Sequence, residues 1–340
     1  MRLLVSLETF LMINRRVLVI AAIATVPTAC TNSGSGSGTA TVPEMAQYRS
    51  VLVKNLERSW MRPTSTGQAL LYDVQGGSSV NIYTFPEGQL VGQLAGSGFY
   101  PRQLCVDPNT QNIWVISSEN FLSSDLIQFA HGSTTQISTL HEQYDFNQFC
   151  SVDPTTGNLA AVTSIQASND TLSVWEQAQG EPTTYNGGWQ WFVGVAYDGS
   201  GNIFMTGGSG LGGKTKVLQE LPQGSNVIKT LAIRKKSYGQ LQWDGAHVAL
   251  GDGSQIQRIS GTKIVGTTTL TGRCNIVGDG FPPTYGSFFI AGNELVGAEF
   301  TKKCLQSVRI YKYPAGGAPI ATLNIPAGYL GVSQSPSPHV

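Results

Sequence analysis

Four aspartates recur at nearly even spacing, and each is of a type that could bind a cation or shape a turn. Asp107, Asp153, Asp198 and Asp244 each follow a short apolar run and open a segment rich in Pro, Gly, Thr, Asn or Ala. A carboxylate in this position accepts hydrogen bonds from nearby backbone N–H groups and so fixes a tight turn. We therefore interpret the four aspartates as turn formers rather than metal ligands.

The sequence offers little support for nucleophilic or phosphate chemistry. None of the four histidines, His131, His141, His247 and His339, lies near a serine or carboxylate in the pattern that a catalytic triad needs. The segment "GGSGLGGKT" (207–215) resembles a phosphate-binding loop, but it joins two predicted strands and precedes no helix. We interpret it as a hairpin loop, and no catalytic residue is predicted.

The aspartates belong to an internal repeat. The segments "LCVDPNTQNIWVIS" (104–117), "CSVDPTTGNLAAVT" (150–163) and "GVAYDGSGNIFMTG" (194–207) each give an apolar strand, an Asp-led turn and a second apolar strand. The second strand begins at six positions separated by 44 to 47 residues, namely Ala69, Ile113, Leu159, Ile203, Val248 and Leu295. A third and usually a fourth strand follow each time. Four short strands per unit predict an all-β fold, a six-bladed β-propeller with four-stranded antiparallel blades.

The two ends of the repeat array predict how the ring closes. The first unit lacks its innermost strand, while the chain ends with "GYLGVSQSPSP" (328–338), which matches the shape of the missing strand. We expect this C-terminal strand to complete blade 1 and so remove the open edges of the ring.

The repeated pattern apolar-x-x-Asp-turn-Gly-Asn-apolar resembles NHL repeats and the wider gluconolactonase-like six-bladed propellers, over residues 60–338. The resemblance to gluconolactonase-like hydrolases implies a divalent cation such as calcium in the central channel. The loops on the corresponding side offer five carboxylates, Glu119, Asp125, Asp170, Asp252 and Glu299, but none lies in a motif that matches the ligands of that family. We therefore favour a non-catalytic binding module without a cofactor, with a metal-dependent hydrolase as the alternative.

Aromatic residues mark the segments that cross from one blade to the innermost strand of the next. In a propeller these crossovers gather around one mouth of the channel. Two roles are open for such rings, packing between neighbouring blades or contact with a flat ligand such as a sugar or peptide. The candidate ligand contacts are Tyr100, Phe146, Trp189, Trp191, Tyr238, Tyr285 and Tyr329.

Two cysteine pairs are possible outside the N-terminal region. The spacing shows no CxxC and no histidine neighbours, so a zinc site is not predicted. Cys274 and Cys304 fall in one repeat and form the favoured disulfide. Cys105 and Cys150 occupy near-equivalent positions in adjacent repeats, where either a bridge or two buried free thiols fits.

The N-terminus predicts export. The segment "MINRRVLVIAAIATVPTAC" (12–30) has two arginines, an apolar stretch too short to span a membrane comfortably, and small residues before Cys30. It resembles bacterial lipoproteins, in which the cysteine carries lipid, although Pro27 departs from the usual motif; an ordinary cleaved signal is the alternative. We expect residues 1–30 to be the signal peptide region, with Met12 as the true start of translation. Residues 31–45 would then form a flexible Gly/Ser tether and residues 46–340 the propeller.

Charge and composition limit the partners. Lys and Arg number 21, and so do Asp and Glu, while only 12% of the 340 residues are charged. A balanced chain gives no electrostatic reason to expect nucleic acid or an anionic membrane surface. The expected partner is a small molecule, glycan, peptide or envelope protein. The expected location is extracytoplasmic, with the chain secreted or held at the cell envelope through lipid on Cys30.

Overall fold

The computed structural model describes residues 56–75, 78–119, 123–143, 147–163, 170–188, 191–209, 215–232, 239–252, 254–272, 287–299, 307–326 and 328–334. The predicted signal peptide, Cys30 and the tether lie outside these residues. Within the described part of the chain, no helix is long and apolar enough to cross a membrane.

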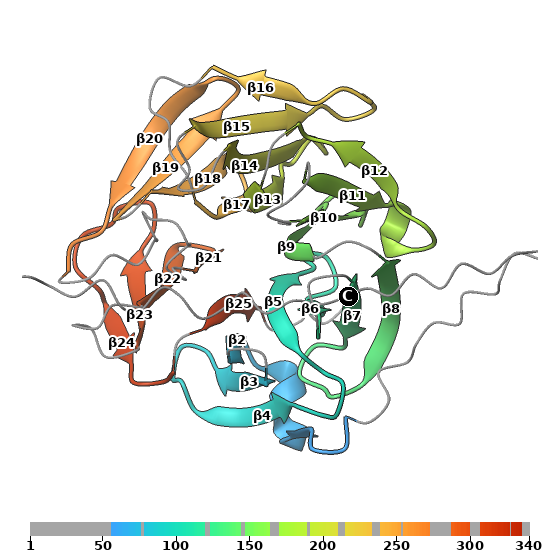
Figure 1. Cartoon of the computed structure of the whole chain (residues 1–340). Helices are drawn as coiled ribbons and strands as arrows, with labels where there is room; N and C mark the ends of the chain where they lie inside the picture. The colour runs from blue at the N-terminus through green and yellow to red at the C-terminus, as the bar shows by residue number, and fades with distance from the viewer. Residues whose placement is uncertain are drawn as a thin grey trace, which may run out of the picture. The chain divides into compact units, whose positions relative to one another are not determined.

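Six antiparallel sheets form a closed ring, as the sequence predicts (Figure 1). Blade 1 contains, from the channel outward, β25 (Tyr329–Ser333), β2 (Leu70–Gln75), β3 (Ser79–Thr84), β4 (Leu90–Leu94) and β1 (Trp60–Met61). Blade 2 contains β5 (Pro101–Val106), β6 (Ile113–Ser117), β7 (Ser123–Phe129) and β8 (Gln136–Gln143). Blade 3 contains β9 (Asn147–Val152), β10 (Leu159–Thr163), β11 (Thr171–Trp175) and β12 (Thr183–Asn186).

The second half of the ring repeats this order. Blade 4 contains β13 (Trp191–Tyr197), β14 (Ile203–Ser209), β15 (Thr215–Leu221) and β16 (Lys229–Leu231). Blade 5 contains β17 (Leu241–Trp243), β18 (Val248–Asp252), β19 (Gln255–Ser260) and β20 (Lys263–Thr269). Blade 6 contains β21 (Phe288–Ala291), β22 (Glu294–Glu299), β23 (Ser307–Lys312) and β24 (Ala321–Leu323). Two short 3₁₀ turns, η1 (Pro63–Gly67) and η2 (Glu176–Ala178), complete the described elements.

The C-terminal strand closes blade 1, which confirms the prediction from the repeat. β25 pairs antiparallel with β2, so that Leu330 lies opposite Asp73 and Val332 opposite Leu71. One strand was not predicted. β1 adds a short fifth strand to the outer edge of this blade, where Trp60 pairs with Gln93. Blade 1 therefore holds both the first and the last described strand of the chain.

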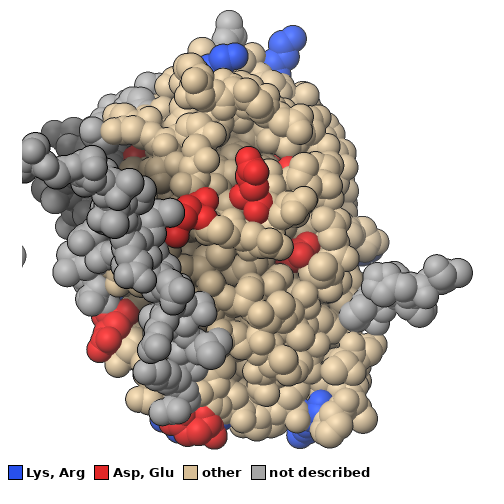
Figure 2. All heavy atoms as spheres, turned by 90° about the vertical axis from the view of Figure 1, so that its right-hand side faces the viewer, with Lys and Arg blue, Asp and Glu red and all other residues tan. Residues whose placement is uncertain are grey.

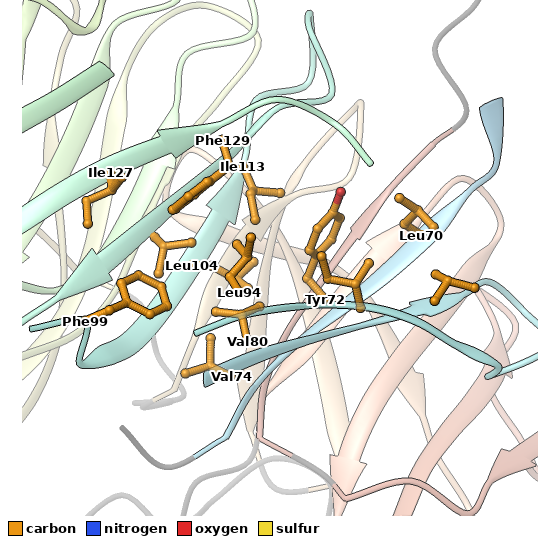
Figure 3. Close-up of a cluster of buried hydrophobic side chains, with 13 residues drawn as sticks. Leu70, Tyr72, Val74, Val80, Leu94, Phe99, Leu104, Ile113, Ile127 and Phe129 are labelled. Atoms are coloured by element: carbon orange, nitrogen blue, oxygen red, sulfur yellow. The ribbon is translucent and has the colours of Figure 1, made fainter. Parts of the chain in front are cut away.

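The hydrophobic core lies between the blades rather than within any one of them. Buried side chains form six separate clusters, and each cluster joins two neighbouring blades. Figure 3 shows the cluster between blades 1 and 2, where Tyr72 and Val80 face Leu104 and Phe129. Each blade thus contributes to two clusters, one on each of its faces.

The second strand of a blade is consequently buried on both faces. In β6, Ile113 and Val115 join the cluster with blade 1, while Trp114 and Ile116 join the cluster with blade 3. Successive side chains of a strand point to opposite faces, so burial on both sides requires a continuous apolar run rather than alternation. This explains why the sequences "IWVI" and "LAAV" of β6 and β10 carry no polar residue.

Polar side chains tie the innermost strands of neighbouring blades together. The Gln242 amide of β17 both donates to Ile290 O (3.0 Å) and accepts from Ile290 N (2.7 Å) of β21, as a peptide group would. Ser151 Oγ of β9 accepts a hydrogen bond from Tyr197 N of β13 at 3.1 Å. These contacts satisfy backbone groups at the inner edges of these sheets, where no further described strand pairs with them.

A buried histidine fastens the closing strand to blade 2. His131, in the β7–β8 connection, places Nε2 3.0 Å from Gln68 O and Nδ1 2.8 Å from Ser333 Oγ of β25. The carbonyl can only accept, so Nε2 carries the proton and Nδ1 accepts from the Ser333 hydroxyl. Next to it, Gly132 N donates to the Tyr72 hydroxyl at 3.0 Å, and burial raises the pKa of Tyr72 to about 12. This network joins β2, β25 and blade 2 at a point that is closed to solvent.

The packing of β25 predicts the effect of a truncation in the closing strand. Leu330 is buried in the cluster between blades 6 and 1, so Leu330→Ala should lower the free energy of unfolding by about 2–4 kcal/mol in urea denaturation. Ile320, which is 49% exposed, provides the matched control; Ile320→Ala should change that energy by about 0.5 kcal/mol or less. Equal effects of the two variants would contradict closure by β25.

The His131 network predicts a pH dependence of stability. Burial lowers the pKa of His131 below its ordinary value of 6.5, so the unfolded chain binds a proton more readily than the folded one. Stability is therefore complete above the unfolded pKa and decreases as pH falls below it. Unfolding free energies measured in urea from about pH 7.5 to about pH 5 should show this slope. In His131→Gln the slope should be shallower, whereas His247→Gln, at a partly exposed ring, should retain it.

Candidate ligand-binding face

The connections between strands alternate between the two faces of the ring, because successive strands of each blade are antiparallel. The four Asp-led turns follow the innermost strands and lie on one face. The crossover segments that precede the innermost strands lie on the other, which we call the crossover face. The predicted aromatic mouth belongs to the crossover face.

The Asp-led turns have the structural role that the sequence predicts. The first carboxylate oxygen of each aspartate accepts a hydrogen bond from the backbone N–H two residues later, at 2.8–2.9 Å, in Asp107, Asp153, Asp198 and Asp244. Asp244 also accepts from the Tyr313 hydroxyl of blade 6 at 2.6 Å, and burial together with this carboxylate raises the pKa of Tyr313. The aspartates therefore shape turns, and one of them also joins two blades.

The aromatic residue Phe99 packs between blades. Phe99 is only 2% exposed, and its ring meets that of Phe129 edge-to-face with centroids 6.1 Å apart. Both belong to the cluster between blades 1 and 2. Phe99 therefore has the packing role, rather than the role of a ligand contact.

Tyr329 has a different environment. It begins β25 in blade 1, yet its ring meets that of Phe149 in blade 3, with centroids 6.4 Å apart and planes at 86°. The innermost strand of blade 2, β5, lies between these two strands in the ring (Figure 1), so the contact extends across part of the channel. The tyrosine is only partly buried and packs against two of the six clusters. Tyr329 therefore lies at the channel, where a ligand at the mouth could reach it.

Tyr100 is held at the start of blade 2 through its backbone. Its N–H donates to Ser117 Oγ at 2.9 Å, and its carbonyl accepts from Ser118 N at 3.0 Å. The side chain is partly exposed, which leaves it available on the crossover face.

The roles of Tyr329 and Tyr100 as ligand contacts stay predictions, and the side chains of the other five candidates are not described. Trp191 begins β13, but only its backbone is described. The remaining candidates lie outside the described residues, namely Phe146, Trp189, Tyr238 and Tyr285. They stay predictions.

Two buried aspartates that the turn motif does not include anchor the crossovers. Asp170 Oδ2 accepts from Phe192 N at 2.6 Å, at the entry to blade 4. Asp73 Oδ1 accepts from Gly328 N at 2.5 Å, at the entry to the closing strand. Gly328 lies so close to β2 that a Cβ there would meet Val74 O at 1.8 Å. A side-chain carboxyl oxygen thus holds the entry to each of these two innermost strands, Asp170 from the preceding blade and Asp73 from the same blade.

Neutral polar side chains add further anchors at the entries to β13 and β25 and in the crossover to β17. Gln219 Nε2 donates to Gly187 O at 3.0 Å, and Thr206 Oγ1 donates to Gly239 O at 2.6 Å. Ser287 Oγ accepts from Leu330 N at 2.9 Å. These anchors were missed because each is a single polar residue within a strand or directly before one, and no repeated motif marks it.

Of the carboxylates considered for a channel metal, Asp125 and Asp170 are separated in the structure. Asp125 Oδ1 lies 2.7 Å from His141 Nδ1 on the outer strands of blade 2, whereas Asp170 binds the crossover backbone of blade 4. Glu119 is exposed, and the side chains of Asp252 and Glu299 are not described. Among the described residues, no three His, Cys, Asp or Glu side chains form a group that could hold a metal ion.

A disulfide joins Cys105 of β5 to Cys150 of β9, with their Cα atoms 5.7 Å apart. Of the two possibilities open for this pair, free thiols are therefore wrong and the bridge is correct. The favoured pair, Cys274 and Cys304, lies outside the described residues. The disulfide links the innermost strands of blades 2 and 3 covalently, at the position where polar side chains link other neighbouring blades.

The comparisons with known proteins agree on the fold. No family model matches the sequence, and no curated protein resembles it closely enough to match. A chain of the nidogen/laminin complex superposes with a TM-score of 0.60 and 10% identity, covering 78% of this chain and 99% of that one. TolB from Acinetobacter baumannii superposes with a TM-score of 0.57 and 15% identity, covering 81% of this chain and 68% of the TolB chain. A functionally unknown protein from Desulfotomaculum acetoxidans DSM 771 superposes with a TM-score of 0.52 and 10% identity, covering 78% of this chain and 99% of that one. The chain has the fold of a six-bladed β-propeller.

The disulfide predicts a loss of stability on its removal. The two cysteines are 45 residues apart, so Cys105→Ala/Cys150→Ala should lower the unfolding free energy by about 3–4 kcal/mol in urea denaturation. The same double variant tests the second pair. If its stability still falls on addition of dithiothreitol, Cys274 and Cys304 are bridged as well. Unchanged stability of the double variant relative to the oxidised protein would contradict the role given to Cys105 and Cys150.

Proposed function

We propose that this chain is a non-catalytic binding module whose ligand or protein partner docks on the crossover face, at the aromatic mouth of the channel. The observation that carries the proposal is the placement of Tyr329. Its partly buried ring extends from the closing strand across part of the channel to Phe149. A ring held in this way supplies apolar area and a polar tip at little entropic cost to a ligand.

The anchoring of the crossovers supports a preformed surface. Asp73 and Asp170 fix the backbone at the entries to β25 and β13, and Ser117 fixes the backbone of Tyr100. Segments fixed in this way lose less freedom when a partner binds, so more of the contact energy appears as affinity. The Trp189 and Trp191 segment leads into the strand that Asp170 holds.

The fold is consistent with recognition of a macromolecule. One of the similar chains comes from a structure of a complex between two proteins, nidogen and laminin. A propeller presents many loops on each face of a rigid ring, which is the arrangement in which loops usually carry binding function. We favour a protein or glycan of the cell envelope as the partner, and an NHL-type relationship of the repeat fits this role.

An extracytoplasmic location fits the same proposal. The Cys105–Cys150 disulfide is of the kind that persists in oxidising compartments. The leader-like segment before Cys30 predicts export, and lipid on that cysteine would hold the propeller at the membrane surface.

Site-specific photo-crosslinking tests the mouth. A photoreactive phenylalanine analogue at position 100 should give discrete covalent adducts when the producing cells are irradiated. The same analogue at position 60, where Trp60 is 42% exposed on the outer rim, should give none. Tyr329→Ala should weaken binding of the partner so identified by about tenfold, and Trp60→Ala should not.

Two outcomes would contradict the proposal. One is equal labelling, or none, at positions 100 and 60. The other is a rise in melting temperature with calcium that EDTA reverses, since specific metal binding stabilises the folded state. That result would favour the gluconolactonase-like hydrolase.

A further inference from the structure

The charges of this chain are balanced overall but divided along the sequence. Residues 103–213 contain ten Asp and Glu and no Lys or Arg, although the whole chain has 21 of each class. This segment includes all of blade 3 and nearly all of blade 2, together with the first two strands of blade 4. One side of the ring is therefore acidic, because every Lys and Arg of the chain lies outside this segment.

The acidic side includes part of the outer rim. Figure 2 faces the side on which β8 and β12 lie, and it shows acidic side chains over the middle of this face, with Lys and Arg only toward its upper and lower edges. Glu119, Glu176 and Glu181 are exposed, and Asp125 is partly exposed. Their fields add over a Debye length of about 8–10 Å, because no Lys or Arg of this segment offsets them.

The outermost strand of blade 2 is an open sheet edge within this acidic side. β8 has eight residues and is the longest of the described strands. It pairs with β7 on one side, and no described element pairs with its other side. A register shift affects only its first residues, so Ser138–Gln143 pair regularly with β7. A regular open edge presents backbone N–H and C=O groups that can pair with another strand.

The other blades protect their outer edges by recognised means. Blade 1 is covered by β1. β12, β16 and β24 have only three or four residues each. β20 is longer, but it begins with Lys263. β8 alone among the described edges is both long and without a lysine, and it exposes Ile137 by 50%.

We propose that the outer edge of β8 receives an extended, lysine- or arginine-bearing segment of a partner protein, which adds to blade 2 as a fifth strand. This site is separate from the crossover face and does not depend on it. Strand addition gives affinity through backbone hydrogen bonds, and the side chains of the added strand determine specificity.

The residues along β8 define what the added segment must carry. One face of the strand carries Ile137, Thr139 and His141. Asp125 Oδ1 of the neighbouring β7 lies 2.7 Å from His141 Nδ1. An apolar side chain in the added strand would cover Ile137, and cations would face the acidic side of the ring. A strand carrying Asp or Glu would be repelled. A segment that alternates Val or Ile with Lys or Arg satisfies both requirements.

Peptide binding tests this proposal. The probe is a fluorescent peptide of four Val-Lys repeats, compared with four Val-Glu repeats and with the Val-Lys peptide methylated at every backbone nitrogen. We expect the first alone to bind in fluorescence anisotropy. Hydrogen exchange should then show protection of amides in 136–143. Ile137→Lys should weaken binding by about fivefold, since like charges on neighbouring strands repel.

Val265→Lys provides the matched control, because Val265 is 51% exposed on β20 and the substitution adds the same charge to another outer edge. It should leave binding unchanged. Equal binding of the methylated peptide would show attraction by charge alone and overturn the proposal. So would binding of the acidic peptide, no binding, protection elsewhere than β8, or equal effects of the two lysine variants. Concentration-dependent self-association that Ile137→Lys abolishes would identify a second copy of this chain as the occupant, which also overturns it.

Discussion

The structure depends on one requirement, that both faces of every blade be covered by a neighbour. The second strands make this plain, since alternate residues of β6 belong to two different hydrophobic clusters. A single blade would expose apolar side chains on both sides and could not be stable alone. An open row of blades cannot meet this requirement, because the first and last blades would each keep one face uncovered. Closure into a ring satisfies it, and β25 provides that closure.

Because closure is essential, the contacts between innermost strands are varied and strong. Blades 2 and 3 are joined by a disulfide, blades 5 and 6 by the amide of Gln242, and blades 1 and 2 by the His131 network. These are different chemical solutions to one geometric problem. The inner edges of the sheets approach each other closely around the channel, and their backbone groups need partners there. Separate polar contacts, from Asp73, Asp170 and Thr206, hold the crossover segments beside these strands.

Much of this architecture could be predicted from the sequence, since a period of about 45 residues and an Asp-led turn are local patterns. The missing first strand and the matching C-terminus also predicted closure. The Cys105–Cys150 bridge remained open because equal positions in consecutive repeats become neighbours only when the blades are arranged around an axis. β1 escaped prediction because two residues have no periodicity. Asp73 and Asp170 were not recognised as anchors because their partners are distant in the sequence: Gly328 enters the closing strand of the same blade, and Phe192 belongs to the next blade.

The arrangement of blade 1 also determines how the molecule would respond to mechanical load. The described chain begins at the outermost position of this blade and ends at its innermost one. Tension applied from the N-terminal side would act first on β1, where Trp60 and Met61 pair with β4 and the flanking Ser59 and Arg62 add hydrogen bonds to Ala95 and Val91. That short pairing would peel away residue by residue before force reached the four strands beneath it. Such tension would thus detach β1 while the ring stayed intact.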